Sequence, residues 1–511
     1  MKRARTSACH HFLPARSYLI LGLLALLALA CALASSRAHA APSAGYIADS
    51  PLVRVGLMRF AGATALTLTA EPGARLLGPE GRERAAGMGP WTITVTQAGA
   101  RASDAQGQEL GTAPAGAVWR LQSDAADTVL GLAAPGRPPR HYRGSLEVRV
   151  AAGRLRVVNE VPLETYLRGV VGSEMGGGAP LEALKAQAVA SRTYALRSLG
   201  QWASEGYDLR DSTDSQVYGG VEAEQPDCDR AIRETSGLIL TVDNQPIVAA
   251  FCADCGGVTA PGPTPEACPR SVVDADAHVG SRSRYHTWTL RYTPQRLAAL
   301  LGRQPALRAP GTLSAVEVAE TDVSGRVRRL RLTWRQPPKP PAVPLPDTPE
   351  DIPDRPQDGE AASLEAPQRT PAPDKNAGAD TPPTPAPSSS KSQKRAPAPR
   401  QAPPAPPPVV REITGNLLRK LLGVDTLRST LFTVHRAPGG AFVFEGHGWG
   451  HGRGMCQAGA MAMAAGPSAS DFQAILRRYY AGADLTHLRY REAEDEESVG
   501  EGHGEEAAHG R

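Results

Sequence analysis

Apolar and polar residues alternate along three runs in the first part of the chain, at positions 53–57, 91–95 and 146–150. A period of two predicts strands with one buried face. Gly and Pro residues separate these runs, as they do at turns. The region 46–160 is therefore predicted to be β-rich.

The apolar period changes after position 160. Apolar residues at 163–171 and again at 181–199 are three or four positions apart, which predicts two helices. The glycine-rich stretch 172–178 between them is expected to be a flexible connection. Short strand patterns follow, including a hairpin around Gly325. This mixture predicts an α+β fold whose core has a first part at 161–335.

A proline-rich stretch then interrupts the core. Residues 336–410 hold half of the 46 prolines and have no periodic apolar pattern. Such a composition buries too little apolar surface to offset the entropy of ordering, so we expect a disordered insert. Helix and strand patterns resume in the C-terminal part of the core at 411–488. The acidic residues 489–511 are expected to be a disordered tail.

The N-terminus indicates export. Lys2 and Arg3 precede an apolar run at 18–33, and a small-x-small site ends at Ala40. These are the three parts of a signal peptide, predicted at 1–40. We therefore expect a protein of the periplasm or cell envelope; the alternative is a lipoprotein anchored at Cys31. No other apolar run is long enough to span a bilayer.

The nearly balanced charge of the chain argues against a nucleic-acid partner. The 511 residues include 56 Lys and Arg against 52 Asp and Glu, a formal net charge of +4. A dedicated nucleic-acid-binding protein carries a strongly basic domain, so we expect no nucleic-acid partner. Aromatic residues make up 5% of the chain, so stacking on sugar rings must depend on a few residues.

Two segments offer acid–base chemistry. Glu174 lies beside Met175 in the glycine-rich connection, where apolar neighbours can raise a carboxyl pKa and create an acid near neutrality. The alternative is a solvated loop carboxylate. His447 and His451 stand four apart in a segment where every second residue is Gly, which favours a loop lining a groove over a helical metal site. The alternative is a solvent-exposed turn.

Four cysteines gather in one stretch: Cys228, Cys252, Cys255 and Cys268. Export favours disulfides, and we predict Cys252 or Cys255 bonded to Cys228 or Cys268. We expect no metal and no cofactor; zinc on the four cysteines is the alternative. Cys456 stands apart and is expected to be a lone thiol.

Several motifs together resemble one family. They read VPLETYLRGVVGSEM at 161–175, PLEALKAQAVASRTYA at 180–195, DSQVYGG at 214–220 and GHGWGHG at 446–452, followed by Gln457. In this order they resemble the stage II sporulation protein D and amidase-enhancer family (SpoIID/LytB). The resemblance covers about 53–480, apart from the proline-rich insert.

The resemblance implies a peptidoglycan lytic transglycosylase. Glu174 matches the family's catalytic acid and Arg192 a substrate-contacting arginine. A lytic transglycosylase needs one carboxyl group, unlike hydrolases with paired acids. Further residues expected to contact the sugar are Tyr194, Asp214, Gln216, Tyr218, His447, His451 and Gln457.

The chain departs from the family pattern at three positions. Gly176 replaces a common Pro, Cys456 a common Ser, and Cys252 a frequent His, which puts a family zinc site in doubt. Some relatives are amidase enhancers, so the alternative function is a non-catalytic wall-binding partner of a cell-wall amidase. A metal-dependent amidase using His447 and His451 is a weaker option, since it lacks a third ligand.

Overall fold

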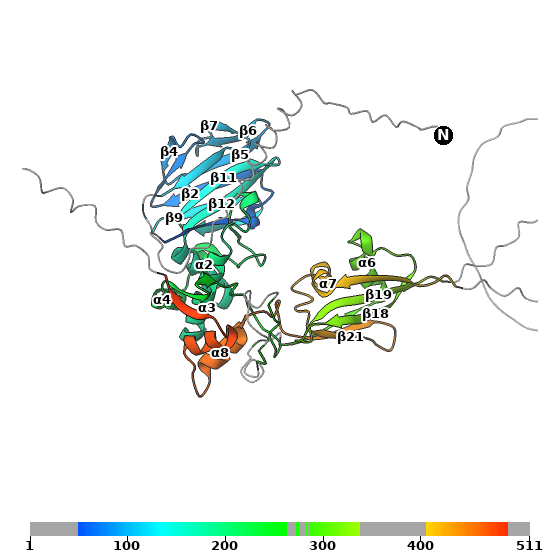
Figure 1. Ribbon diagram of the computed structural model, residues 1–511. Coiled ribbons are helices and arrows are strands. Elements are labelled where there is room, and N and C mark those ends of the chain that lie inside the picture. The colour runs from blue at the N-terminus through cyan, green and yellow to red at the C-terminus, as the bar shows by residue number, and fades with distance from the viewer. Residues whose placement is uncertain are drawn as a thin grey trace, which may run out of the picture. The chain divides into compact units, whose positions relative to one another are not determined.

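A computed structural model describes residues 50–123, 125, 127–262, 272–274, 283, 286–337 and 405–488 (Figure 1). The predicted signal peptide, Cys31, Cys268, the acidic tail and most of the proline-rich insert lie outside these residues. The chain divides into a main unit and a smaller unit made of residues 309–312 and 334–409. The described part mixes helices and sheets, so the α+β class is confirmed.

Two sheets form the N-terminal part of the main unit. The first contains, in spatial order, β13 (Leu209–Arg210), β1 (Leu52–Gly56), β12 (Arg154–Pro162), β11 (Ser145–Ala151), β8 (Val118–Gln122), β3 (Ala74–Leu77) and β4 (Glu83–Gly87). The second contains β10 (Arg137–Tyr142), β9 (Val129–Ala134), β2 (Ala65–Glu71), β5 (Trp91–Thr96), β6 (Gly99–Ser103) and β7 (Glu109–Pro114).

Alternation explains why these segments are strands with one buried face. Val53 and Val55 of β1, and Leu66 and Leu68 of β2, are completely buried, while the residues between them are partly exposed. Side chains from both sheets join one buried cluster, which also includes Leu163 of the helix that follows β12. Residues on both sides of position 160 share the first sheet, because β13 pairs in parallel with β1.

Three helices follow the sheets: α2 (Leu163–Met175), α3 (Leu181–Arg197) and α4 (Pro226–Glu234). The first is longer than predicted, and Glu174 lies in its last turn rather than in a flexible connection. The helix ends at Met175, and the capping residue Gly176 has a φ of 72°, a positive value that glycine adopts without strain.

A second buried cluster lies between α3 and the C-terminal elements. Those elements are α8 (Gln457–Ala465), α9 (Phe472–Tyr479), the sheet of β15 (Gln245–Pro246), β14 (Leu238–Val242) and β24 (Asp484–His487), and the pair of β16 (Phe251–Cys252) and β23 (Met455–Cys456). Residues more than 200 positions apart therefore meet: Cys252 is the strand partner of Cys456.

Two more sheets lie between these elements along the chain. One contains β17 (Thr287–Tyr292), β22 (Phe442–His447) and β21 (Phe432–Arg436), and the other contains β18 (Thr312–Thr321), β19 (Val327–Arg335) and β20 (Val409–Thr414). Two short helices accompany them, α6 (Pro294–Leu301) and α7 (Gly415–Leu422). Within the described ranges, no helix has both the length and the apolar character required to cross a bilayer.

Candidate active site

Glycines of α2 allow the segment that contains Tyr218 and Ala223 to pack closely against the helix that carries Glu174. Side chains at Gly169 and Gly172 would overlap Tyr218 and the carbonyl oxygen of Ala223. Both contacts come from the segment that ends in the short 3-10 helix η3 (Gly220–Ala223). The glycine face of α2 therefore brings this segment against the turn that carries Glu174.

Two donors from distant parts of the chain hold the Glu174 carboxylate. The backbone N–H of Val217 donates to Oε1 at 2.9 Å, and Nε2 of Gln457 lies 3.5 Å from Oε2. Desolvation raises the pKa of Glu174, and these two donors offset part of that rise. Because its pKa is raised, Glu174 stays protonated to higher pH than a free glutamate. The residue is half-buried, so part of it still meets solvent.

Buried polar side chains surround this carboxylate. Gln457 also donates to Oε1 of Gln187 at 3.3 Å, and Nε2 of Gln187 donates to Oγ of Ser191 at 3.0 Å. The hydroxyl of Tyr166 donates to Oε1 of Gln216 at 3.3 Å. The sequence analysis missed Gln187 and Ser191, which look like ordinary members of an Ala-rich helix.

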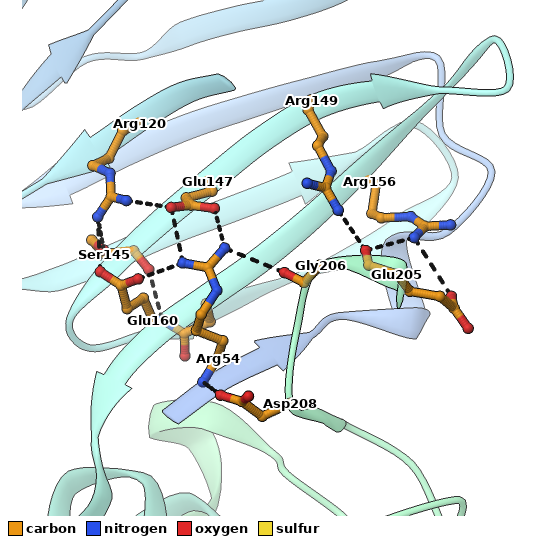
Figure 2. Close-up of polar contacts among 11 residues, drawn as sticks. Arg54, Arg120, Ser145, Glu147, Arg149, Arg156, Glu160, Glu205, Gly206 and Asp208 are labelled. Carbon is orange, nitrogen blue, oxygen red and sulfur yellow. Dashed lines mark hydrogen bonds and ion pairs between the residues drawn. The ribbon is translucent and has the colours of Figure 1, made fainter. Parts of the chain in front are cut away.

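The segment that carries Val217 is tied to the first sheet. Arg54 donates from its backbone to Asp208, and its guanidinium lies between the carboxylates of Glu147 and Glu160 and reaches the carbonyl of Gly206 (Figure 2). Arg149 and Arg156 bind Glu205 of the same segment (Figure 2).

A second anchor follows within this segment. Asp211 accepts from the backbone N–H of Met58 at 2.8 Å and donates its own N–H to the carbonyl of Gly56. Together with the Arg54 contacts, this anchor fixes the segment that delivers the Val217 N–H.

Four predicted substrate residues are buried, and one of them is Gln457, which is 4% exposed and lies against the Glu174 carboxylate. Arg192 is completely buried and forms a bidentate ion pair with Glu164 at 2.7 and 2.8 Å. Tyr218 donates to Oδ1 of Asn159 at 2.8 Å and packs against Tyr142 and Tyr166. Gln216 is 1% exposed. These side chains hydrogen-bond within the protein and support the fold around Glu174, and their contact with a sugar stays a prediction.

The other predicted groups remain accessible. Tyr194 is half-buried, and Asp214 is exposed and pairs with Arg210 at 3.1 Å. His447 and His451 are exposed: His447 is the last residue of β22, and His451 lies in the loop that follows, which is joined to Asp254 through Trp449. Among the hydrogen bonds between described residues, Gln457 is bonded to Glu174, whereas neither His447 nor His451 is.

The two histidines have different surroundings. The ring of His447 lies 6.4 Å from that of His286, whose Nδ1 is 3.2 Å from Asp254. Nδ1 of His451 accepts from the backbone N–H of Arg453. Desolvation by the surrounding loops and nearby guanidinium groups lower the pKa of His451 to about 4, although its surface is exposed. His451 is therefore neutral at pH 7.

The cysteines differ from the sequence prediction. Cys228, Cys252, Cys255 and Cys456 are buried free thiols, so the predicted bond from Cys228 to Cys252 or Cys255 is wrong. Cys268 lies outside the described residues. Cys456 is not isolated, because its Sγ accepts from the backbone N–H groups of Cys255 and Gly459 and caps α8. The Cys-for-Ser replacement thus keeps a capping acceptor.

One group of side chains could hold a metal ion. Ligand atoms of Asp254, Cys255 and Cys456 lie within 4.8 Å of one another, and all three residues are buried. Thiolate and carboxylate ligands suit zinc. Cys228 is not part of this group, so the predicted four-cysteine alternative does not assemble among the described residues.

Comparisons with known proteins match part of the chain to one family. Residues 151–242 match the family model of the Stage II sporulation protein, SpoIID. Stage II sporulation protein D of Bacillus subtilis is 37% identical over 117 residues, which cover 20% of this chain and 34% of that protein. The amidase enhancer of the same organism is 28% identical over 322 residues, covering 63% of this chain and 40% of the relative.

A third relative, an uncharacterized protein of Brachyspira hyodysenteriae, is 39% identical over 119 residues, covering 23% of this chain and 32% of the relative. The matches thus span about a third to two fifths of each relative's length. Glu174 and Val217 lie inside the region matched by the family model, and Gln457 lies outside it. Residues 151–242 therefore match the SpoIID family, and this match confirms the resemblance seen in the sequence for that part of the chain.

Proposed function

We propose that the protein is an exported enzyme that cuts peptidoglycan glycan strands by lytic transglycosylation, with Glu174 as the single acid and base. The observation that carries this proposal is the desolvated Glu174 carboxyl group, whose pKa is raised and whose two oxygens face Val217 and Gln457. The family relationship supports a role at the cell wall.

The reaction needs one proton carrier. Glu174 in its acid form donates a proton to the glycosidic oxygen, and the bond from that oxygen to C1 of the muramyl residue breaks. The 6-hydroxyl of the same residue then bonds to C1, and its proton returns to the Glu174 carboxylate. No water attacks, so no second carboxylate is required, in contrast to glycosidases with paired acids. Within the described residues, no other carboxylate contributes to the pKa shift of Glu174.

Product analysis tests the proposal. Purified glycan strands, with and without stem peptides, are incubated with the protein, and the products are identified by mass spectrometry. We expect 1,6-anhydromuramyl ends, and a loss of about 100- to 10,000-fold in the Glu174→Gln variant. The matched control is Glu234→Gln, since Glu234 lies on α4 and pairs with Lys185 and Arg230. Reducing ends, or equal cleavage by Glu174→Gln, would contradict the proposal.

A second function is favoured by one comparison. The relative named amidase enhancer matches over 63% of this chain. An enhancer would bind the wall and stimulate an amidase without cutting glycan, and it would need no acid at position 174. Stimulation of an amidase by wild type and Glu174→Gln alike, with no glycan cleavage, would establish this alternative.

A further inference from the structure

The helix α3 buries an amide where an apolar side chain would be expected. Its buried face is formed by small apolar residues such as Ala183, Ala186 and Ala190, yet Gln187 and Ser191 on the same helix are completely buried. A buried amide costs free energy unless its donors and acceptors are satisfied. The contacts of Gln187 therefore indicate why it is there.

The Gln187 side chain connects α3 to the carboxylate of the proposed active site. Its Nε2 donates to Ser191 Oγ at 3.0 Å, one turn along α3, so its Oε1 faces Nε2 of Gln457 at 3.3 Å. The same Nε2 of Gln457 lies 3.5 Å from Glu174 Oε2. An amide nitrogen carries two hydrogens, and here one points to Gln187 and the other to Glu174.

Gln457 depends on this contact for its orientation. It is the first residue of α8 and is 4% exposed. If its amide were rotated by 180°, its oxygen would face Oε1 of Gln187 and Oε2 of Glu174, two acceptors when Glu174 is ionised. We propose that Gln187 is a positioning residue that holds the Gln457 amide with its N–H toward Glu174. This inference rests on the proposed function in assigning Glu174 as the acid.

The orientation matters because the charge on Glu174 changes during the reaction. As Glu174 gives its proton to the glycosidic oxygen it becomes a carboxylate, and an N–H donor binds a carboxylate more strongly than a neutral acid. The Gln457 amide therefore stabilises the transition state more than the bound substrate, which lowers the barrier. Gln187 acts on this step through Gln457 and does not touch the substrate.

Two titratable groups close to the end of α2 are neutral around pH 7. Tyr166 of α2 interacts with Glu174, and burial raises its pKa well above the usual value. Cys228 of α4 lies 4.0 Å from the carbonyl of Gly176, and burial raises its pKa to about 11. The segment 211–218 contributes the Val217 N–H, α3 contributes Gln187, and α8 contributes Gln457. Gln457 is thus the side chain whose hydrogen bond lowers the pKa of Glu174, against the larger rise caused by desolvation.

The test uses Gln187→Met, which keeps the length of the side chain and removes the acceptor. The titration of Glu174 is followed by carbon-13 NMR of labelled glutamate carboxyl groups in the purified protein, with Glu174→Gln assigning the signal. We expect the midpoint to move to higher pH, and kcat for glycan cleavage to fall about tenfold with KM unchanged. The matched control is Thr193→Val, which removes another completely buried polar group from α3 and should leave the Glu174 midpoint unchanged.

A double-variant cycle separates positioning from general damage. In a Gln457→Met background, Gln187→Met should cause no further shift of the Glu174 midpoint. An unchanged midpoint in Gln187→Met, or an equal shift in both backgrounds, would overturn the inference. If Gln187→Met does not fold, Gln187→Asn, which is one methylene too short to reach Gln457, takes its place. The NMR readout needs no cleavage, so failure of the proposed function alone leaves this test intact.

Discussion

Replacing Arg192 by Met distinguishes a structural role from substrate contact. The guanidinium is completely buried, donates twice to the Glu164 carboxylate, and donates to the carbonyl oxygens of Leu238 and Ile232 at 3.0 and 3.4 Å. It therefore joins α2, α4 and the start of β14 to α3. We expect Arg192→Met to destabilise the protein rather than to weaken glycan binding specifically.

The structure sets the size of the loss. Removing one partner of a buried ion pair costs about 3–5 kcal/mol, because the other charge stays behind without compensation. The side chain of Glu164 is 24% exposed, so water can partly rehydrate it and the lower end applies, about 3 kcal/mol. At ~2–4 °C per kcal/mol for a unit of this size, the melting temperature should fall by about 6–12 °C.

The assay combines thermal unfolding with glycan-strand sedimentation at a temperature where the variant is folded. Arg168→Met is the matched control: Arg168 on α2 also pairs with two carboxylates, but its side chain is 29% exposed and Glu224 keeps its second partner, Arg143. A smaller loss than for Arg192→Met is therefore expected. Adding Glu164→Leu to Arg192→Met should recover part of the stability, but not all, because the two carbonyl oxygens still lack their donor. An unchanged melting temperature with loss of glycan binding would refute this reasoning and support the substrate role inferred from the sequence.

Three further predictions follow from the same contacts. Gly172→Ala should lower the melting temperature, because the overlap of its Cβ with the backbone of Ala223 costs about 1–3 kcal/mol and outweighs the gain in helix propensity of about 1 kcal/mol; a more stable variant would show that α2 and η3 are not in contact. The pKa of Glu174 is raised on folding, so its contribution to stability is complete below the unfolded pKa and is lost as pH rises through the folded pKa. Glu174→Gln should therefore be more stable than wild type at neutral pH, with the difference vanishing in acid, and denaturant unfolding at several pH values would reveal a constant difference if this is wrong. Burial raises the pKa of Cys252, and the contact with Cys255 together with burial raises the pKa of Cys456. A maleimide should therefore label these thiols slowly in the native protein and quickly after denaturation without reductant; disulfides found by mass spectrometry, or rapid native labelling, would contradict this.

Periodic patterns were sufficient to predict individual elements. The alternating runs became β1, β5 and β11, and the helical spacing became α2 and α3, because each pattern already separates a buried face from an exposed one. The end of α2 was predicted too early. Glycines usually weaken a helix, but Gly169 and Gly172 are required here by the neighbouring segment, and that contact is tertiary.

The sequence predicted some residues of the candidate site and missed others, because tertiary contacts are not visible in a local pattern. Glu174 and Gln457 were recognised as motif residues, and the structure brings them together. Arg192 and Tyr218, which the resemblance predicts to contact substrate, are both buried, and a motif gives the identity of a residue but not its exposure. Gln187 was overlooked because a single amide in an apolar helix shows its role only once its partner, 270 positions away, is known.

The assembly of the site also limits what the family-matched segment can do alone. Residues 151–242 supply Glu174, the Val217 N–H and Gln187, but the amide that faces Glu174 comes from Gln457, 283 positions along the chain from that carboxylate. Two three-stranded sheets and the predicted insert lie between these parts in the sequence. The proposed chemistry therefore requires α8 to pack on α3, and α8 can do so only if the chain returns correctly through β22 and β23. Substitutions that weaken the buried cluster between α3 and α8 should then impair glycan cleavage even where they leave the matched segment unchanged.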